Sequence, residues 1–229
     1  MAPRGLFITF EGGEGAGKTT QIKRLAASLG GNTIQTREPG GTPEAEALRN
    51  AFFQNNGQDW PVEALVLLMF SARVLHTENL IRPTLARGTN VLCDRYTDST
   101  RVYQGYAGDL PLEKIEQIKT LSIGDFEPDI TFILDIAPEE GLKRAGARAG
   151  ETTFEAKDIE FHEKIRQGFL TIARENPNRC VVIDATQDAD TIAAQILKAT
   201  QEKLQQKLSS SGLTEGSMDS PIMLANDKR

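Results

Sequence analysis

Residues Gly12–Thr19 read GGEGAGKT and follow a short apolar run, Leu6–Glu11, that reads LFITFE. The spacing matches the pattern G-x-x-x-x-G-K-S/T, the P-loop, which joins a strand to a helix and binds phosphate groups. Glycine lets the backbone approach phosphate oxygens closely, so consecutive amide N–H groups can converge on one anion. A strand pattern precedes the motif and a helical pattern over Lys18–Leu29 follows it. We therefore expect a nucleoside triphosphate site at the end of the first strand.

The side chains of the P-loop predict how phosphates and a metal ion are held. Lys18 would place its positive charge on the β- and γ-phosphates, and the Thr19 hydroxyl would coordinate Mg²⁺. The helix that follows would point the positive end of its dipole at the same anion. The alternative is a glycine-rich turn that binds nothing, which the flanking patterns disfavour. The predicted triphosphate-binding residues are Gly12, Gly13, Glu14, Gly15, Ala16, Gly17, Lys18, Thr19 and Thr20.

The chain has 229 residues and a formal net charge of −6. This length is enough for one α/β domain with a well-buried core and does not require a second domain. Because the chain is acidic and has no basic block, we expect no nucleic-acid partner. An acidic protein that binds a triphosphate must concentrate its positive charges locally, so the arginines near the P-loop are the next candidates for the site.

The cysteines and histidines do not suggest a disulfide or a metal site. Cys93 and Cys180 each lie in an apolar, strand-like run without a C-x-x-C pair, which favours buried reduced thiols. His76 and His162 are isolated, so a zinc site is not expected. No apolar run is expected to reach the length of a membrane span, and the N-terminus carries no signal-like core. We therefore predict a cytoplasmic protein without a membrane partner.

Five short apolar runs alternate with helical patterns along the chain. This alternation predicts a three-layer α/β fold, with a five-stranded parallel sheet flanked by helices and substrates beyond the carboxyl ends of the strands. The Ser/Gly-rich segment from residue 208 to 229 is expected to be a disordered tail. Strands are predicted at 6–11, 32–36, 89–93, 129–135 and 180–184, and helices at 18–29, 42–53, 61–86, 112–122, from 138, 156–175 and 188–207.

Charged residues end the predicted third strand at the edge that the P-loop would occupy. Asp94 is placed where Mg²⁺ is usually steered in P-loop folds, so we predict it as a second metal ligand. Arg95 is a candidate for the concentrated positive charge. The alternative for this Asp-Arg pair is an ion pair with only a structural role.

Two further segments have open interpretations. The helix 61–86 contains the continuous apolar stretch 64–70, so it either packs on both sides or forms a subunit contact. Phe70 and Arg73 share a face of that helix, although a phenylalanine is more often a core residue than a ligand platform. The segment 143–150, KRAGARAG, is predicted as a mobile basic lid over phosphates, and the alternative is a solvated helix end.

Taken together, several motifs resemble bacterial thymidylate kinases and occur in order between about residues 5 and 205. They are FEG at 10–12 with the P-loop, TREPGGT at 36–42, LLMFSAR at 67–73, DRY at 94–96, Ser99 with YQG at 103–105, and GLKR at 141–144. The resemblance implies a P-loop kinase fold with one kinase domain over 1–207 and a lid at about 143–155. It also implies transfer of the γ-phosphoryl group of ATP to dTMP, giving dTDP and ADP with Mg²⁺, by a homodimer that contacts through helix 61–86.

The resemblance implies a role for each residue at a matching position. Phe70 would stack on thymine, and Arg73 would hydrogen-bond the base. Tyr103 would pack under the deoxyribose and leave no room for a 2′-hydroxyl. Arg95, supported by Arg49, would hold the acceptor phosphate. The implied substrate-binding residues are Glu11, Glu38, Pro39, Arg49, Phe70, Arg73, Arg95, Ser99, Thr100, Tyr103 and Gln104.

Phosphoryl transfer needs in-line positioning and neutralised charge on the transferred oxygens. Members of this family take a basic residue from either the P-loop or the lid, and positions 14–16 of this loop are not basic. The resemblance therefore assigns the role to Arg148 in the lid, with Arg144 as the second candidate. Thr152 and Thr153 stand where members of the family often carry an arginine, so lid contacts there differ. The predicted catalytic residues are Lys18, Arg95, Arg148, Arg144 and Glu11.

Two other functions compete with this one. A GTP-binding switch would need an Asp-x-x-Gly segment and an Asn-Lys-x-Asp guanine reader, and the sequence has neither. A kinase for another nucleoside monophosphate, or for a nucleoside, is the closer alternative. Arg49, Arg73 and Arg95 favour a phosphorylated acceptor, because an uncharged nucleoside gives them nothing to pair with.

Overall fold

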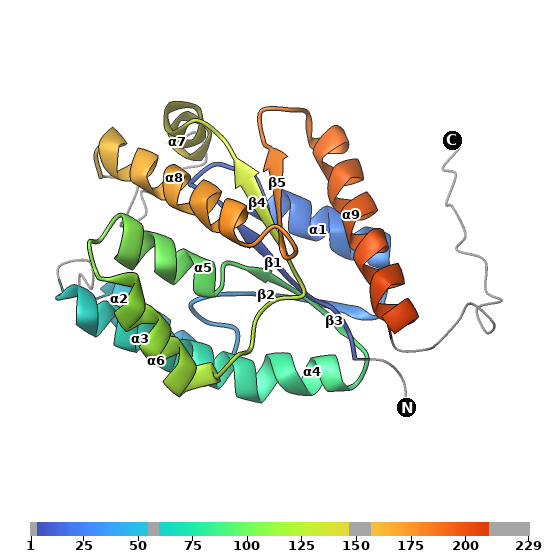
Figure 1. Ribbon diagram of the computed structural model, residues 1–229, viewed down its shortest axis with the longest axis horizontal. Helices are drawn as coiled ribbons and strands as arrows, with labels where there is room; N and C mark the ends of the chain where they lie inside the picture. Colours follow the sequence, from blue (N-terminus) through green and yellow to red (C-terminus); the bar gives the residue numbers. More distant parts are fainter. Residues whose placement is uncertain (1–3, 55–59, 147–156, 211–229) are drawn as a thin grey trace.

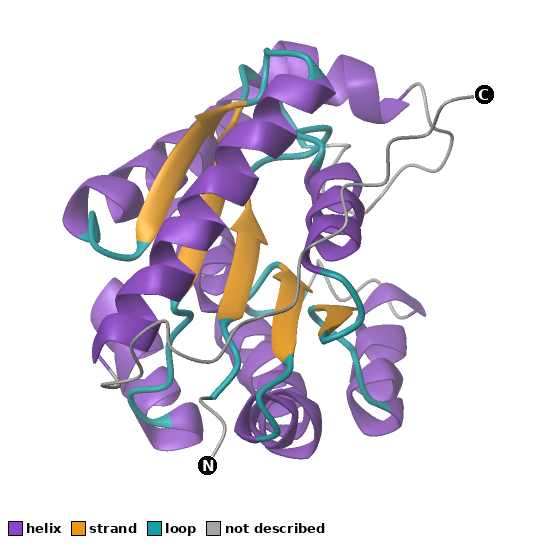
Figure 2. Ribbon diagram, turned by 90° about the vertical axis from the view of Figure 1, so that its right-hand side faces the viewer, coloured by secondary structure: helices purple, strands orange, loops and turns teal. Residues whose placement is uncertain are grey.

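The computed structural model describes residues 4–54, 60–146 and 157–210, and it is built on a five-stranded sheet (Figure 1). The strand order is β2-β3-β1-β4-β5, and all neighbouring strands are parallel. Figure 2 shows the strands running in the same direction. The strands are β1 (Phe7–Glu11), β2 (Thr33–Arg37), β3 (Asn90–Asp94), β4 (Ile130–Asp135) and β5 (Cys180–Asp184). The predicted five-stranded parallel α/β sheet is confirmed.

Helices cover both faces of this sheet. On one face, α1 (Lys18–Leu29) packs beside α9 (Ala189–Ser210), and on the other, α8 (Ile159–Glu175) covers β4 and β5. The last helix was predicted to end at about residue 207, and α9 continues to Ser210; the rest of the predicted tail lies outside the described residues. The other helical segments are α2 (Pro43–Gln54), α3 (Val62–His76), η2 (Thr77–Ile81), α4 (Arg82–Ala86), α5 (Thr97–Thr100), η3 (Arg101–Tyr106), α6 (Leu112–Ile123) and α7 (Pro138–Gly146).

The central strand β1 is buried along its whole length. Ile8 and Phe10 pack with side chains of α1 and α9, whereas Phe7 packs with side chains of η2 and α4 on the opposite face. A strand that is buried on both faces must be apolar almost throughout, which is why LFITF reads as a continuous run. Phe10 pairs with Asp94 of β3, so the P-loop and the end of β3 emerge from the sheet side by side.

The segment 61–86, predicted as one helix, contains a π-helical turn, η2, between α3 and α4. Pro83 follows this turn. In a regular α-helix its ring would clash with the carbonyl of Asn79 and leave that carbonyl without a donor. The wider π-helical turn makes room for the proline ring and changes the hydrogen-bond pattern at the position where the proline has no N–H.

By length and composition alone, the 25 residues Val62–Ala86 could cross a membrane. The sequence-based expectation that no run reaches that length is therefore wrong, because the apolar stretch 64–70 is extended by further apolar turns. Within the protein, 44% of the most apolar window is buried. The core helix of a soluble protein gives the same signal, so this segment is weak support for a membrane partner.

Candidate active site

A cavity of about 370 Å³ lies where the P-loop meets the carboxyl ends of β2 and β3. Its volume is in the range of roughly 300–1,000 Å³ that is typical of small-molecule sites. α2, α3, α5 and η3 complete its walls, and we refer to Arg95–Gln104 as the acceptor wall. The predicted residues that line the cavity are Glu14, Gly15, Ala16, Gly17, Lys18, Thr19, Glu38, Pro39, Arg49, Arg73, Asp94, Arg95, Ser99, Thr100, Tyr103 and Gln104.

The ammonium group of Lys18 is folded back onto the P-loop. Its Nζ donates to the carbonyl oxygens of Gly12 at 3.0 Å and Gly13 at 2.9 Å. Burial, together with the nearby charge of Arg95, lowers the pKa of Lys18. A triphosphate would offer this cation a full negative charge in place of two carbonyl dipoles, so the loop is arranged to exchange its own oxygens for those of a phosphate.

The carboxylate of Glu14 connects the P-loop to the acceptor wall. It accepts from Arg95 Nη2 at 2.7 Å and from the Tyr103 hydroxyl at 3.1 Å. Burial works to raise the pKa of Glu14, but the charges of Arg95 and Lys18 outweigh it and lower that pKa. Arg95 also donates to Gly12 O at 3.2 Å and to Ser99 Oγ at 3.3 Å. An acceptor phosphate would compete with Glu14 for the same guanidinium group.

Arg73 reaches the cavity from α3 with part of its hydrogen-bonding capacity unused. Its Nε donates to Glu38 Oε2 at 2.7 Å, and its Nη2 donates to Tyr96 O and Thr100 Oγ1, both at 3.1 Å. Glu38 is fixed in turn by a contact of 3.1 Å between its Oε1 and Nδ1 of His76. Arg73 Nη1 is buried and has no partner among the described residues. Because Arg73 lines the cavity, this spare donor is suited to an acceptor atom of a ligand.

Glu11 was predicted to face the acceptor nucleotide, but the structure places it behind the acceptor wall and outside the cavity lining. Its carboxylate accepts from Tyr96 N at 2.7 Å and from Ser99 Oγ at 2.6 Å. Burial, followed by the charge of Asp98, raises the pKa of Glu11 to about 7. Glu11 is the last residue of a fully buried strand, so its side chain supports the wall from within the core.

Phe70 is also placed away from the cavity opening. It is 1% exposed and packs with Val66, Leu110 and Ile115. The Arg73 guanidinium lies over its ring at 4.7 Å from the centroid, and Met69 is its neighbour on the cavity lining. In this structure Phe70 is therefore a core residue, as the alternative interpretation expected. Its stacking on thymine stays a prediction.

α7 carries the second lid candidate, Arg144, but directs it away from the cavity. Arg144 Nη1 donates to Ala185 O at 2.8 Å, and its Nη2 pairs with Glu140. Arg148 and the rest of the predicted lid from residue 147 lie outside the described residues. The other predicted residues that do not line the cavity are Gly12, Gly13 and Thr20.

The P-loop packs directly on the backbone of α7. A Cβ atom on Gly15 would lie 1.9 Å from the carbonyl oxygen of Gly141, and one on Gly141 would lie 2.4 Å from that of Glu14. Both distances are impossible for a side chain, so glycine is required on each side of this contact. This explains why the GLKR motif on α7 begins with glycine.

Sequence reasoning missed several lining residues. Phe53 lies under the Arg49 guanidinium at 4.6 Å from the ring centroid, and Arg49 donates to Pro39 O at 3.0 Å. The i to i+4 spacing of Arg49 and Phe53 was a signal that could have found this pair. The missed lining residues are Arg37, Phe52, Phe53, Met69, Tyr96 and Ala145.

The residues proposed for Mg²⁺ lie together on the cavity wall. The Thr19 hydroxyl donates to Asp94 Oδ2 at 3.2 Å. Within the described part of the chain, no group of three or more His, Cys, Asp or Glu side chains could hold a metal ion alone. Mg²⁺ is usually bound by one or two protein oxygens together with water and substrate phosphates. One hydroxyl and one carboxylate therefore fit Mg²⁺ that arrives with a nucleotide.

Comparisons with known proteins agree with this geometry. The sequence profile of the thymidylate kinase family matches residues 10–196. A thymidylate kinase of Caulobacter vibrioides is 50% identical over 204 residues, which cover 88% of this chain and 98% of that protein. One from a Bradyrhizobium species is 48% identical over 207 residues, covering 88% of this chain and 92% of that protein. The crystal structure of thymidylate kinase from Ehrlichia chaffeensis is similar with a TM-score of 0.72 at 37% identity, covering 87% of this chain and 99% of that one. The chain belongs to the thymidylate kinase family.

Proposed function

We propose that this protein is a dTMP kinase, which transfers the γ-phosphoryl group of ATP to dTMP and gives dTDP and ADP for dTTP synthesis. Family membership supports the reaction. The observation that carries the choice of acceptor is Arg73, which lines the cavity and whose buried Nη1 has no partner among the described residues. It would donate to an oxygen of the thymine base. The alternative, a kinase for another nucleoside monophosphate, has no observation in its favour.

The donor half of the reaction is assigned to the P-loop. Lys18 would leave the carbonyls of Gly12 and Gly13 to bind the β- and γ-phosphates of ATP. Thr19 and Asp94 would hold Mg²⁺, which supplies charge neutralisation on the phosphate oxygens when it is bound. The backbone amides of the loop would bind the remaining phosphate oxygens.

The acceptor half is assigned to the acceptor wall and α2. Arg95 would exchange Glu14 for the phosphate of dTMP, with Arg49 in support. Tyr103 would lie under the deoxyribose, and its hydroxyl is already fixed by Glu14. The remaining acceptor contacts are assigned to Glu38, Pro39, Phe70, Ser99, Thr100 and Gln104.

The cation that stabilises the transferred phosphoryl group is assigned to Arg148, with Arg144 second. No basic side chain stands at positions 14–16 of the P-loop, and α7 leads directly into the segment that carries Arg148. An arginine in this role can contribute about 10³–10⁵ in rate.

The protein is further proposed to act as a cytoplasmic homodimer with no nucleic-acid partner. The subunit contact is proposed from the all-round apolar character of α3, on which Leu67 is 55% exposed. The net charge of −6 disfavours nucleic acid.

Release of ADP from ATP and Mg²⁺ with dTMP, dUMP, UMP, CMP or AMP as acceptor tests the proposed function. We expect the highest kcat/KM with dTMP, because the Arg73 donor disfavours the amino groups of CMP and AMP, and Tyr103 disfavours the 2′-hydroxyl of the ribonucleotides. Removing Mg²⁺ with a chelator should abolish turnover. Equal or faster turnover of CMP or AMP would contradict the assignment, and it would favour the alternative.

A further inference from the structure

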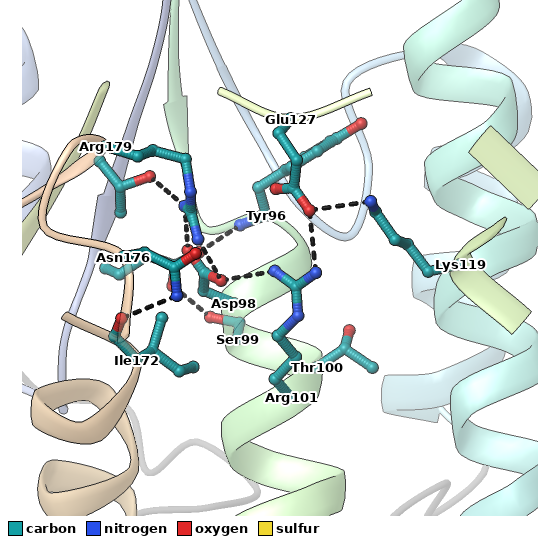
Figure 3. Close-up of polar contacts among 12 residues, drawn as sticks. Tyr96, Asp98, Ser99, Thr100, Arg101, Lys119, Glu127, Ile172, Asn176 and Arg179 are labelled. Carbon is teal, nitrogen blue, oxygen red and sulfur yellow. Dashed lines mark hydrogen bonds and ion pairs between the residues drawn. The ribbon is translucent and has the colours of Figure 1, made fainter. Parts of the chain in front are cut away.

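A second charged cluster lies on the side of the acceptor wall that faces away from the cavity, and none of its residues lines the cavity. Its centre is Asp98 on α5, which is 2% exposed. The Asp98 carboxylate accepts from Arg101 Nη1 at 2.7 Å and from Arg179 Nη1 and Nη2 at 2.6 and 3.2 Å. Figure 3 shows Asp98 between the two guanidinium groups. It is therefore held both by η3 and by the residue that immediately precedes β5.

The cluster extends from Asp98 to α6 and to the loop before β4. Arg101 donates from Nε and Nη2 to Glu116 at 2.7 and 3.1 Å, and from Nη2 to Glu127 Oε1 at 2.8 Å. Lys119 Nζ lies 2.9 Å from the same oxygen of Glu127. Three carboxylates and three cations balance in charge, as a buried ionic group requires. The members of this Asp98 cluster are Asp98, Arg101, Glu116, Lys119, Glu127 and Arg179.

Arg179 also fixes the cluster to the centre of the sheet. Its Nη1 donates to Thr131 Oγ1 at 2.8 Å, and Thr131 shares a hydrogen bond of 2.7 Å with Thr9. Thr9 lies in β1, whose last residue, Glu11, accepts from Ser99. Buried side chains thus attach the acceptor wall to the sheet at Glu11 and at Asp98.

The elements that carry the acceptor wall need external support. α5 has four residues, and its N-terminus at Tyr96 has no side-chain cap. It continues directly into η3, and the combined helical segment 97–106 is still too short to have much stability of its own. Ser99 and Thr100 line the cavity, whereas Asp98, beside them in the chain, is held by the cluster on the other side. η3 is a π-helical turn that begins at Arg101 and carries Tyr103 and Gln104.

We propose that Asp98 is a positioning residue for the acceptor nucleotide. By pairing with Arg101 and Arg179, it fixes α5 and η3 so that the wall presents Ser99, Thr100 and Tyr103 in one arrangement. Asp98 touches no substrate; it acts through the residues that do. This role rests on the proposed dTMP kinase activity, and it differs from a purely stabilising ion cluster, which would leave acceptor affinity unchanged.

Kinetic constants of the Asp98→Asn variant, with ATP and dTMP varied separately, test this role. Asparagine keeps the size of the side chain but removes the charge that holds both arginines. We expect KM for dTMP to rise about tenfold and KM for ATP to change less than about twofold, because only the acceptor wall loosens. Calorimetric Kd values for dTMP without ATP should rise by the same factor.

Glu116→Gln is the matched control, since Glu116 bonds the same arginine from α6 but has a side chain that is 45% exposed. It should leave KM for dTMP within about twofold of the wild type. If Asp98→Asn fails to fold, Arg179→Lys takes its place, because lysine cannot donate from two nitrogens to Asp98. Equal changes in both KM values, or no change in KM for dTMP in a folded variant, would overturn the proposal. A wild-type protein inactive on dTMP would instead refute the proposed function.

Discussion

The P-loop and the acceptor wall face each other across one cavity, but they are held in place differently. The P-loop is shaped by glycines and by its own carbonyl oxygens, which hold Lys18. The acceptor wall is held by buried carboxylates, Glu11 and Asp98, whose pairings with Ser99 and Arg179 join residues far apart in the chain. Phosphate is common to all nucleotides and can be bound by backbone. Recognition of one base and sugar needs side chains, and each of these needs support from another residue.

The largest expected effect concerns the P-loop. Lys18→Met should lower kcat by about 10³-fold, because the ammonium stabilises charge that develops on the transferred phosphoryl group. KM for dTMP should change by less than about threefold, since the acceptor wall keeps its contacts. Steady-state kinetics with each nucleotide varied will measure both. A rise in KM for dTMP as large as the fall in kcat would mean that the P-loop and the acceptor wall do not act independently.

A smaller effect is expected when the support of Arg73 is weakened. Glu38→Gln should raise KM for dTMP about tenfold and lower the free energy of unfolding by about 4 kcal/mol, because it leaves Arg73 buried without its counter-charge. Denaturant titration and kinetics will measure these changes.

Glu46→Gln is the control for Glu38→Gln. Glu46 pairs with Arg37, and this pair is more exposed than the pair of Glu38 and Arg73. The substitution should lower the free energy of unfolding by less than about 1 kcal/mol. Similar losses of stability in the two variants would show that burial does not set the strength of these pairs.

The smallest effect is a dependence of stability on pH. The pKa of Glu11 is about 7 in the folded protein, against an ordinary value of 4.5 for a solvated glutamate, so the folded state binds more protons between these values. Stability contributed by this group should therefore fall as pH rises from 4.5 to 7, by up to about 3 kcal/mol, and stay level above pH 7. Glu11→Gln should remove this slope. Denaturant titration from pH 5 to 8 will measure it, and parallel profiles for the two proteins would contradict the assignment.

Contiguous features of this protein could be predicted from the sequence, and remote pairings could not. The strand pattern gave the parallel sheet, and the P-loop together with the residues assigned from the family resemblance gave most of the cavity lining. The ion pair between Glu14 and Arg95 joins residues far apart in the chain and leaves no spacing to detect. The same holds for Asp98 and Arg179.

The direction in which a side chain points was the second feature that the sequence could not predict. Phe70 and Met69 are neighbours on one apolar helix, and periodicity could not decide which of them faces the cavity, because α3 is apolar nearly all round. Glu11 is a charged residue at the end of an apolar strand, and it was expected at the surface of the site. Its partners, Tyr96 N and Ser99, come from a segment whose path only the folded chain reveals.

The contact between Gly15 and Gly141 has a mechanical consequence. With no side chain between the P-loop and α7, nothing in the contact can bend or change rotamer to absorb a shift. Any displacement of the loop would therefore act directly on the backbone of α7. α7 ends at Gly146, two residues before Arg148 in the sequence, so the contact joins the P-loop to the helix that precedes the assigned catalytic arginine. Alanine at either glycine would force the two backbones apart and loosen the contact between the P-loop and α7.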